Sequence, residues 1–269
     1  MNGVFENYQT LDGSTLFLGA FFFTIQIYGD FSGYSDIAIG CARLFGIDLM
    51  QNFKYPYFSR DIAEFWRRWH ISLTTWFRDY IYIPLGGSRV GKWKSFRNTL
   101  VIFLVSGFWH GANWTFVAWG AYHALLFLPL LLLGQNRRYR DSVAENSFLP
   151  SVKELTQMGV TFLLVLLGWI LFRSEDISQA AVSLERMFNA SLFSAPQLVG
   201  LGFGQLLLKK CFFFTALMFV VEWIGRKQAH GLMIEDLSLP VRYVIYTVLL
   251  IIIYGFDASN PQGFIYFQF

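Results

Sequence analysis

Charged residues are scarce in this 269-residue chain, in which Asp, Glu, Lys and Arg together make up only 14%. A soluble globular domain carries about 25% charged residues. Hydrophobic residues make up 55% of the chain, aromatic residues make up 19%, and the mean hydropathy is positive at +0.43. The composition therefore argues against a water-soluble domain and predicts an integral membrane protein.

Cysteine is nearly absent as well, since the chain holds only Cys41 and Cys211, far apart and both in apolar surroundings. This excludes a disulfide framework and a cysteine-based metal centre. The chain has no phosphate-binding loop, dinucleotide fingerprint, serine-hydrolase elbow or zinc-ligand spacing. The polar stretch 1–13 has no basic region and does not resemble a signal peptide. We expect neither a metal nor a bound cofactor.

The longest stretch without any charged residue lies between Arg97 and Arg137, and it contains His110, Asn113 and His123. At about 1.5 Å per residue, a helix of this length crosses a bilayer roughly twice. Ionisable groups are costly to bury at membrane depth, so a histidine there is a functional-site hypothesis by default. The alternative is a buried histidine that a neighbouring helix satisfies.

Uncharged runs give the organisation of the rest of the chain. Together they predict five to seven membrane segments and an all-α fold, a polytopic transmembrane helical bundle forming a single membrane-embedded domain over 1–269. The runs on which this count rests are 13–29 (extending to about 42), 98–136, 155–172, 211–221 and 243–256.

Between these runs, residues 60–80 have helical periodicity with aromatic side chains on one arc and most charges outside it. Tryptophans on one face and basic residues on the other are typical of a helix lying in the headgroup plane. We therefore predict an interfacial amphipathic helix over 60–80, with His70 at the edge of the aromatic arc. The region 54–97 holds nine basic and three acidic residues, which indicates a cytoplasmic face.

Residues 98–136 form the predicted catalytic histidine segment. A glycine, Gly111, breaks it directly after His110. A broken helix is tolerated at membrane depth only where it is buried in protein or lines a wet cavity, so His110 is expected beside a cavity. There a neutral imidazole can act as a general base that takes a proton from a hydroxyl group attacking an acyl group.

Three neighbours of this histidine are candidates for supporting roles. Trp109 and Trp114 could form walls of a substrate tunnel, and Asn113 could orient the ring or donate a hydrogen bond to a developing oxyanion. Two tryptophans near a histidine also occur in ordinary packing.

The other histidines and intramembrane carboxylates have plainer alternatives. His70 could be an ordinary interfacial histidine, and His123 could face His110 or form hydrogen bonds within the bundle. His230 follows two basic residues in a polar loop and is expected to be solvated. The carboxylates of Asp30 and Asp36 indicate a packing or tunnel role rather than direct catalysis.

Taken together, these segments resemble the membrane-bound O-acyltransferase family, and most closely its bacterial branch. That branch includes the membrane subunit of alginate O-acetylation and relatives acting on peptidoglycan and teichoic acid. The resemblance is specific over about 25–130 and weaker toward the C-terminus. The matching segments are 28–40, 52–57, 64–73, 76–80, 83–87 and 107–114, with a further similarity at 264–269.

The resemblance implies that His110 is the catalytic histidine in a tunnel through the membrane and that His70 is a second important position. The implied reaction moves an acyl group, with acetyl expected, onto a hydroxyl of an envelope polysaccharide such as alginate or onto an intermediary acyl-carrying protein. The implied co-substrate is an acyl thioester, expected to be acetyl-CoA. Periplasmic or extracellular partner proteins and a bacterial inner-membrane location are also implied.

One departure from the family concerns the start of the chain. Members of the family carry a further block of spanning helices before the region that matches 29–34. We therefore expect this chain to be the C-terminal portion of such a domain, without its N-terminal helices and with a tunnel that lacks a wall.

Two other functions remain open at this stage. A haem- or metal-binding electron carrier would use His110 and His123 as ligands from two helices, and would show a haem absorbance band after extraction. A transporter-like or scaffold remnant would use its intramembrane polar residues to line a pathway or to pack helices. Nucleic acid is a poor alternative partner, because the basic residues alternate with tryptophans beside spanning helices.

Overall fold

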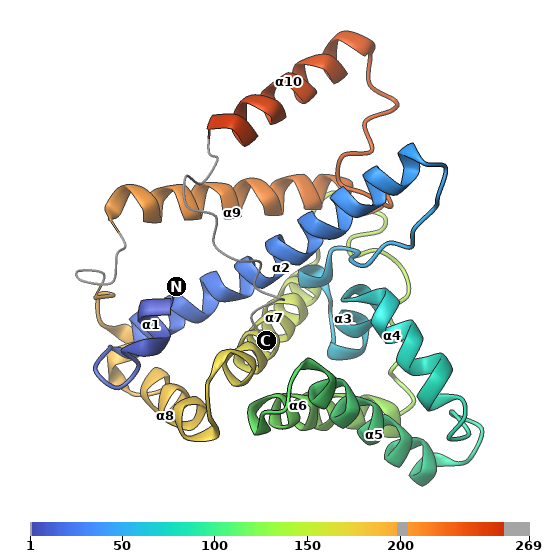
Figure 1. The fold of residues 1–269 in the computed structure, drawn as a ribbon, viewed down its shortest axis with the longest axis vertical. Coiled ribbons are helices and arrows are strands. Elements are labelled where there is room, and N and C mark those ends of the chain that lie inside the picture. The colour runs from blue at the N-terminus through green and yellow to red at the C-terminus, as the bar shows by residue number, and fades with distance from the viewer. Residues whose placement is uncertain (1, 198–203, 256–269) are drawn as a thin grey trace.

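A computed structural model describes residues 2–197 and 204–255, and in these ranges the chain is helical and contains no strand (Figure 1). The predicted all-α fold class is confirmed there, while the family-like segment 264–269 lies outside the described residues. The α-helices are α1 (Asn2–Glu6), α2 (Gly13–Leu44), α3 (Ile62–Arg68), α4 (Ile71–Phe77), α5 (Lys92–His110), α6 (Trp114–Leu132), α7 (Val152–Arg173), α8 (Ile177–Met187), α9 (Gln205–Gly225) and α10 (Leu239–Gly255). Short 3₁₀ turns η1 (Pro56–Phe58) and η3 (Ala190–Phe193) and a π-helical turn η2 (Arg78–Tyr82) complete them.

Two of these helices, α6 and α7, are long and apolar enough to cross a membrane, and α10 is a shorter apolar helix. Helices also form over the other predicted runs, and α2 extends continuously from residue 13 as predicted. The larger count of five to seven membrane segments is not established by the described helices and stays a prediction.

Helices α5 and α6 form a tight antiparallel hairpin that ends at the predicted break beside Gly111 (Figure 1). Two glycines allow the backbones of α5 and α6 to lie this close together. A Cβ atom on Gly107 would lie 2.2 Å from the carbonyl oxygen of Phe116, and one on Gly120 would lie 2.2 Å from that of Phe103. Small residues that let backbones meet are the usual means of packing helices in membranes. The hairpin places His110 at its closed end.

The core is aromatic and lies where α2, α3, α6 and α7 meet. Trp69, Trp119 and Trp169 are each 1% exposed. The Trp169 ring centroid lies 5.0 Å from that of Trp69 and 5.8 Å from that of Trp119. Rings at these separations interact favourably beyond the area that they bury. This cluster joins the α5–α6 hairpin to the segment that carries His70.

The structure corrects the predicted helix over 60–80, which forms two short helices, α3 and α4, followed by η2. Trp69 is extended and His70 has a left-handed backbone with φ of +44°. The helix stops because tertiary hydrogen bonds replace its own. The amide of Ile71 donates to the carbonyl of Asn52 at 2.9 Å, and residues 52–54 run beside this break.

The faces of this segment also differ from the prediction. Arg60, Glu64 and Arg68 lie outside the aromatic arc, yet all three are buried, whereas Trp76 and Tyr80 on the arc are exposed. The Glu64 carboxylate accepts from Arg60 at 3.0 Å and from Arg68 at 2.6 Å. Burial of these charges is possible because each is paired and hydrogen-bonded.

The same charged cluster holds distant segments against α3. Arg60 donates to the Asp141 side chain at 3.1 Å and lies 3.5 Å from the Glu154 carboxylate at the start of α7. Arg67 donates to the backbone carbonyls of Asn136 and Tyr139, both at 2.6 Å. The long connection between α6 and α7 is therefore fixed to α3.

Replacing Gly120 by Ala should weaken the hairpin. The added methyl must push two backbones apart, and overpacking of this kind costs about 1–3 kcal/mol. Thermal unfolding in detergent should therefore occur at a lower temperature. Gly159→Ala is the matched control, because a Cβ on that α7 glycine meets nothing within 4 Å. Equal unfolding temperatures for the two variants would contradict this packing.

Replacing Glu64 by Gln should destabilise the fold by about 3–5 kcal/mol, because two buried arginines lose their shared counter-charge. The measurement is the unfolding midpoint in detergent. Asp79→Asn is the control: its carboxylate pairs with Arg78 at the surface, where both side chains are about half exposed. The control should have the same unfolding midpoint as the unmodified protein. If Glu64→Gln also has that midpoint, the stabilising role of the Glu64 carboxylate is refuted.

Candidate functional site

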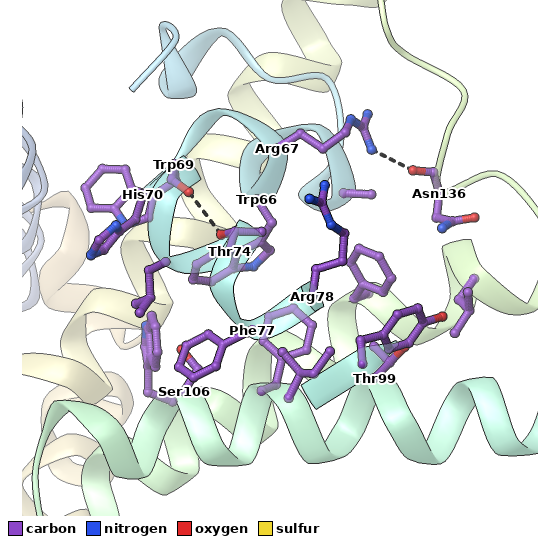
Figure 2. A pocket seen from close by; sticks show the side chains of 18 of the residues that line it. Trp66, Arg67, Trp69, His70, Thr74, Phe77, Arg78, Thr99, Ser106 and Asn136 are labelled. Carbon is purple, nitrogen blue, oxygen red and sulfur yellow. Dashed lines mark hydrogen bonds between the residues drawn. The ribbon is translucent and has the colours of Figure 1, made fainter. Parts of the chain in front are cut away.

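A cavity of about 280 Å³ lies between the α3–α4 segment and the α5–α6 hairpin. His70 and His110 both line it, and so do the cationic side chains of Arg67, Arg78 and Arg137. Figure 2 shows His70 at one side of this space, with Arg67, Arg78 and Asn136 away from it toward the other side. The remaining wall is mostly apolar, with Phe77, Ile102, Phe103, Phe127 and Leu131 among its members.

Aromatic rings hold the imidazole of His110, the last residue of α5. Its ring centroid lies 5.3 Å from that of Trp119, at 90°, and 5.0 Å from that of Phe172. Trp109 packs against it at 4.9 Å. The ring therefore occupies a defined position at the end of the hairpin, as the sequence predicts for a histidine beside a cavity.

His70 enters the same cavity from the turn between α3 and α4. It is 9% exposed, and its ring lies edge-on to Phe31 at 4.7 Å. Burial lowers the pKa of His70 to about 4, because desolvation disfavours the charged form. Below its unfolded pKa of about 6.5 this histidine costs stability, and at neutral pH its ring is uncharged. The structure thus brings together the two histidines that the sequence singled out.

The predicted supporting residues lie elsewhere, since Trp109, Asn113 and Trp114 do not line this cavity. Trp114 is 77% exposed. Trp109 is half exposed and packs beside both histidine rings, with its centroid 6.3 Å from that of His70. For these two residues the role of tunnel walls stays a prediction.

Asn113 caps a helix. Its side-chain oxygen accepts from the amide of Thr115 at 3.1 Å, and its amide nitrogen donates to the carbonyl of Glu175 at 2.7 Å. Asparagine is a preferred N-cap residue, which explains its place just before α6 without a catalytic role. The predicted role in orienting His110 or stabilising an oxyanion stays a prediction.

His123 is fully buried and does not line the cavity. Its ring packs 5.0 Å from Trp66 and 5.1 Å from Trp119, and neither ring nitrogen has a hydrogen-bond partner among the described residues. Trp119 contacts both His110 and His123.

The remaining titratable candidates make surface contacts. His230 is about half exposed and lies 3.2 Å from the Asp36 carboxylate. Its partner raises the pKa of His230 through a hydrogen bond. The pair joins the loop after α9 to the C-terminal part of α2.

Sequence reasoning missed several residues of the cavity wall. Ser106 lies four residues before His110, one helical turn away on the same face, and this spacing could have identified it. Arg78 belongs to the basic region 54–97, whose excess of positive charge does not single out any one residue. Trp119 gave no signal of its own, and the α5–α6 hairpin brings its ring beside His110.

The sequence around this site is similar to that of known proteins. The family model of the membrane-bound O-acyltransferase family matches residues 3–144, a range that contains both histidines. This chain belongs to the membrane-bound O-acyltransferase family. It is therefore a membrane protein, and the resemblance drawn from the sequence motifs is confirmed.

Curated relatives agree with this assignment. The chain is 43% identical over 196 residues to a probable alginate O-acetylase AlgI of Pseudomonas aeruginosa, covering 71% of this chain and 36% of the relative. It is 41% identical over 165 residues to a peptidoglycan O-acetyltransferase of Helicobacter pylori, covering 61% and 30% respectively. It is 30% identical over 163 residues to a teichoic acid D-alanyltransferase of Bacillus subtilis, covering 57% and 40%. The chain thus spans about a third of the length of these relatives.

Proposed function

We propose that this chain carries the catalytic centre of a membrane O-acyltransferase that moves an acetyl group onto a hydroxyl of a cell-envelope polysaccharide such as alginate. The observation that carries the proposal is one cavity whose wall holds both histidines, three arginines and a mostly apolar remainder. The relatives named as O-acetylases and acyltransferases of envelope polymers support this reaction class.

In this proposal His110 is the general base. Its neutral imidazole accepts the proton of the acceptor hydroxyl while the hydroxyl oxygen forms a bond to the carbonyl carbon of the acyl thioester. The carbon–sulfur bond then breaks, and His110 returns the proton to the departing sulfur, which leaves as a thiol. The packing of Trp119 and Phe172 around the ring keeps it oriented and limits water near the acyl group.

The arginines on the side of the cavity away from His70 (Figure 2) indicate where the donor would bind. Arg78 is exposed at this end and is paired only with the surface carboxylate of Asp79 among the interactions described. Guanidinium groups bind phosphates through charge-assisted hydrogen bonds. A thioester with a phosphorylated carrier, such as acetyl-CoA, would place its phosphates at Arg78 and its acyl group near His110.

The proposal also covers the membrane location of the protein and the acceptor of the acyl group. We infer a multi-pass protein of the bacterial inner membrane, whose spans include α6 and α7. The acyl group would leave toward the periplasmic or extracellular side, to the polysaccharide itself or to an intermediary acyl-carrying protein. Partner proteins on that side would complete the transfer.

Replacing His110 by Ala in the intact protein should lower acetyl incorporation into the envelope polymer by at least about 100-fold, because the general base is lost. Membrane insertion and protein level should not change. His230→Ala is the matched control, since that histidine lies in a loop away from the cavity and should leave incorporation intact. Full activity of His110→Ala would refute the proposed mechanism.

Replacing Arg78 by Gln should raise the KM for the thioester donor roughly three- to tenfold with little change in kcat, because one phosphate contact is weakened. The measurement is acetyl transfer by membranes at varied donor concentration. Arg89→Gln is the control, an exposed arginine in the loop before α5 that does not line the cavity. An unchanged KM for Arg78→Gln would place the donor elsewhere.

A further inference from the structure

The backbone at His70 has an unusual conformation, with φ of +44° and ψ of +55°. This left-handed region is disfavoured for a residue with a Cβ atom, so the surroundings must impose it. Two backbone hydrogen bonds flank the residue. Lys54 donates to the carbonyl of Arg68 at 3.0 Å, and Ile71 donates to the carbonyl of Asn52 at 2.9 Å. Residues 52–54 therefore hold both sides of the turn.

The side chain of Asn52 forms further hydrogen bonds that fix this turn. Its oxygen accepts from the backbone amide of Ser72 at 3.2 Å and from the Ser72 hydroxyl at 2.5 Å, and its nitrogen donates to the Ser35 hydroxyl at 3.3 Å. A backbone amide can only donate. The atom of Asn52 that faces it must therefore be the oxygen, which fixes the orientation of the side-chain amide.

The direction of the next hydrogen bond follows from this orientation. An amide oxygen cannot donate, so the single hydroxyl proton of Ser72 points to Asn52. The Ser72 oxygen also lies 3.4 Å from Nδ1 of His70. With its proton committed, this oxygen offers only lone pairs to the ring. The contact therefore requires a proton on Nδ1 and leaves the ring lone pair on Nε2.

We propose that Asn52 and Ser72 are positioning residues that hold His70 in its Nδ1–H tautomer, with Nε2 as the nitrogen that accepts a proton or a hydrogen bond. Neither residue lines the cavity, so each acts through His70. Which ring nitrogen carries the proton is commonly set by the partner of the other nitrogen. The consequence for catalysis rests on the proposed acyl transfer, whereas the tautomer itself does not.

The direct test is nuclear magnetic resonance of the intact protein in a lipid bilayer, with histidine labelled with ¹³C and ¹⁵N. The spectrum of His70→Gln identifies the His70 signals by their loss. At neutral pH we expect the Nδ1–H form in the unmodified protein and in Ser72→Thr, which keeps the hydroxyl. Ser72→Ala should give a mixture of tautomers. An Nε2–H form in the unmodified protein overturns the proposal, whether or not the protein transfers acyl groups.

The kinetic test uses the same variants. Ser72→Ala should lower kcat by about 10- to 100-fold, the usual cost of losing a residue that orients a functional side chain, with the donor KM unchanged. Ser72→Thr should restore kcat. Asn52→Asp keeps an acceptor oxygen toward Ser72 and should keep the tautomer, whereas Asn52→Ala should not. The proposal is overturned if Ser72→Ala leaves both the tautomer and kcat unchanged. It is also overturned if both Ser72 variants lose kcat while the tautomer stays the same, because Ser72 then has another role.

Discussion

The carboxylate of Glu64 is the constraint on which the arrangement depends. It is 1% exposed and lies between two buried arginines, Arg60 and Arg68. A charge buried this deeply is tolerable only when its partners are held in place, so the cluster has few alternative packings. Because Arg60 also binds Asp141 and approaches Glu154, the position of α3 is fixed relative to the connection before α7 and to α7 itself.

From this anchor the site is built by two rigid parts that meet. One part is α3 with the turn at His70, which is held by the charged cluster and by residues 52–54. The other is the α5–α6 hairpin, whose glycines bring the two backbones together and set His110 at its closed end. Trp69, Trp119 and Trp169 fill the space between them. The two histidines therefore line one cavity although forty residues of sequence separate them.

The chemical character of the cavity changes along its wall. The imidazole of His70 lies at one side of the cavity, and Arg67 and Arg78 lie toward the other (Figure 2). A low-dielectric surrounding keeps the buried His70 uncharged and able to accept a proton. An exposed cationic end suits an anionic carrier, whose charge stays near water while its acyl group enters the apolar part. This gradient makes the cavity suitable for a donor with a charged head and a small reactive end.

Local sequence determined the features that depend on local physics. The scarcity of charge indicated a membrane protein, Gly111 marked the end of α5, and the uncharged run singled out His110. The motifs around both histidines were sufficient to identify the family. Periodicity failed between 60 and 80, because it treats every charged side chain as one that seeks water. Glu64 is buried instead through a partner set that reaches Asp141, 81 residues from Arg60.

Only the tertiary structure decided the rest. The left-handed turn at His70 exists because Asn52 and Lys54 form hydrogen bonds on both sides of it, and no local pattern encodes that pairing. Arg67 and Arg78 came to the same cavity as His110, and the Asn113 amide nitrogen found the carbonyl of Glu175, through contacts between segments far apart in the chain. The sequence thus determined which histidines are candidates for the chemistry. The packing of paired charges and close helices decided what surrounds them, because those energies arise only when distant segments meet.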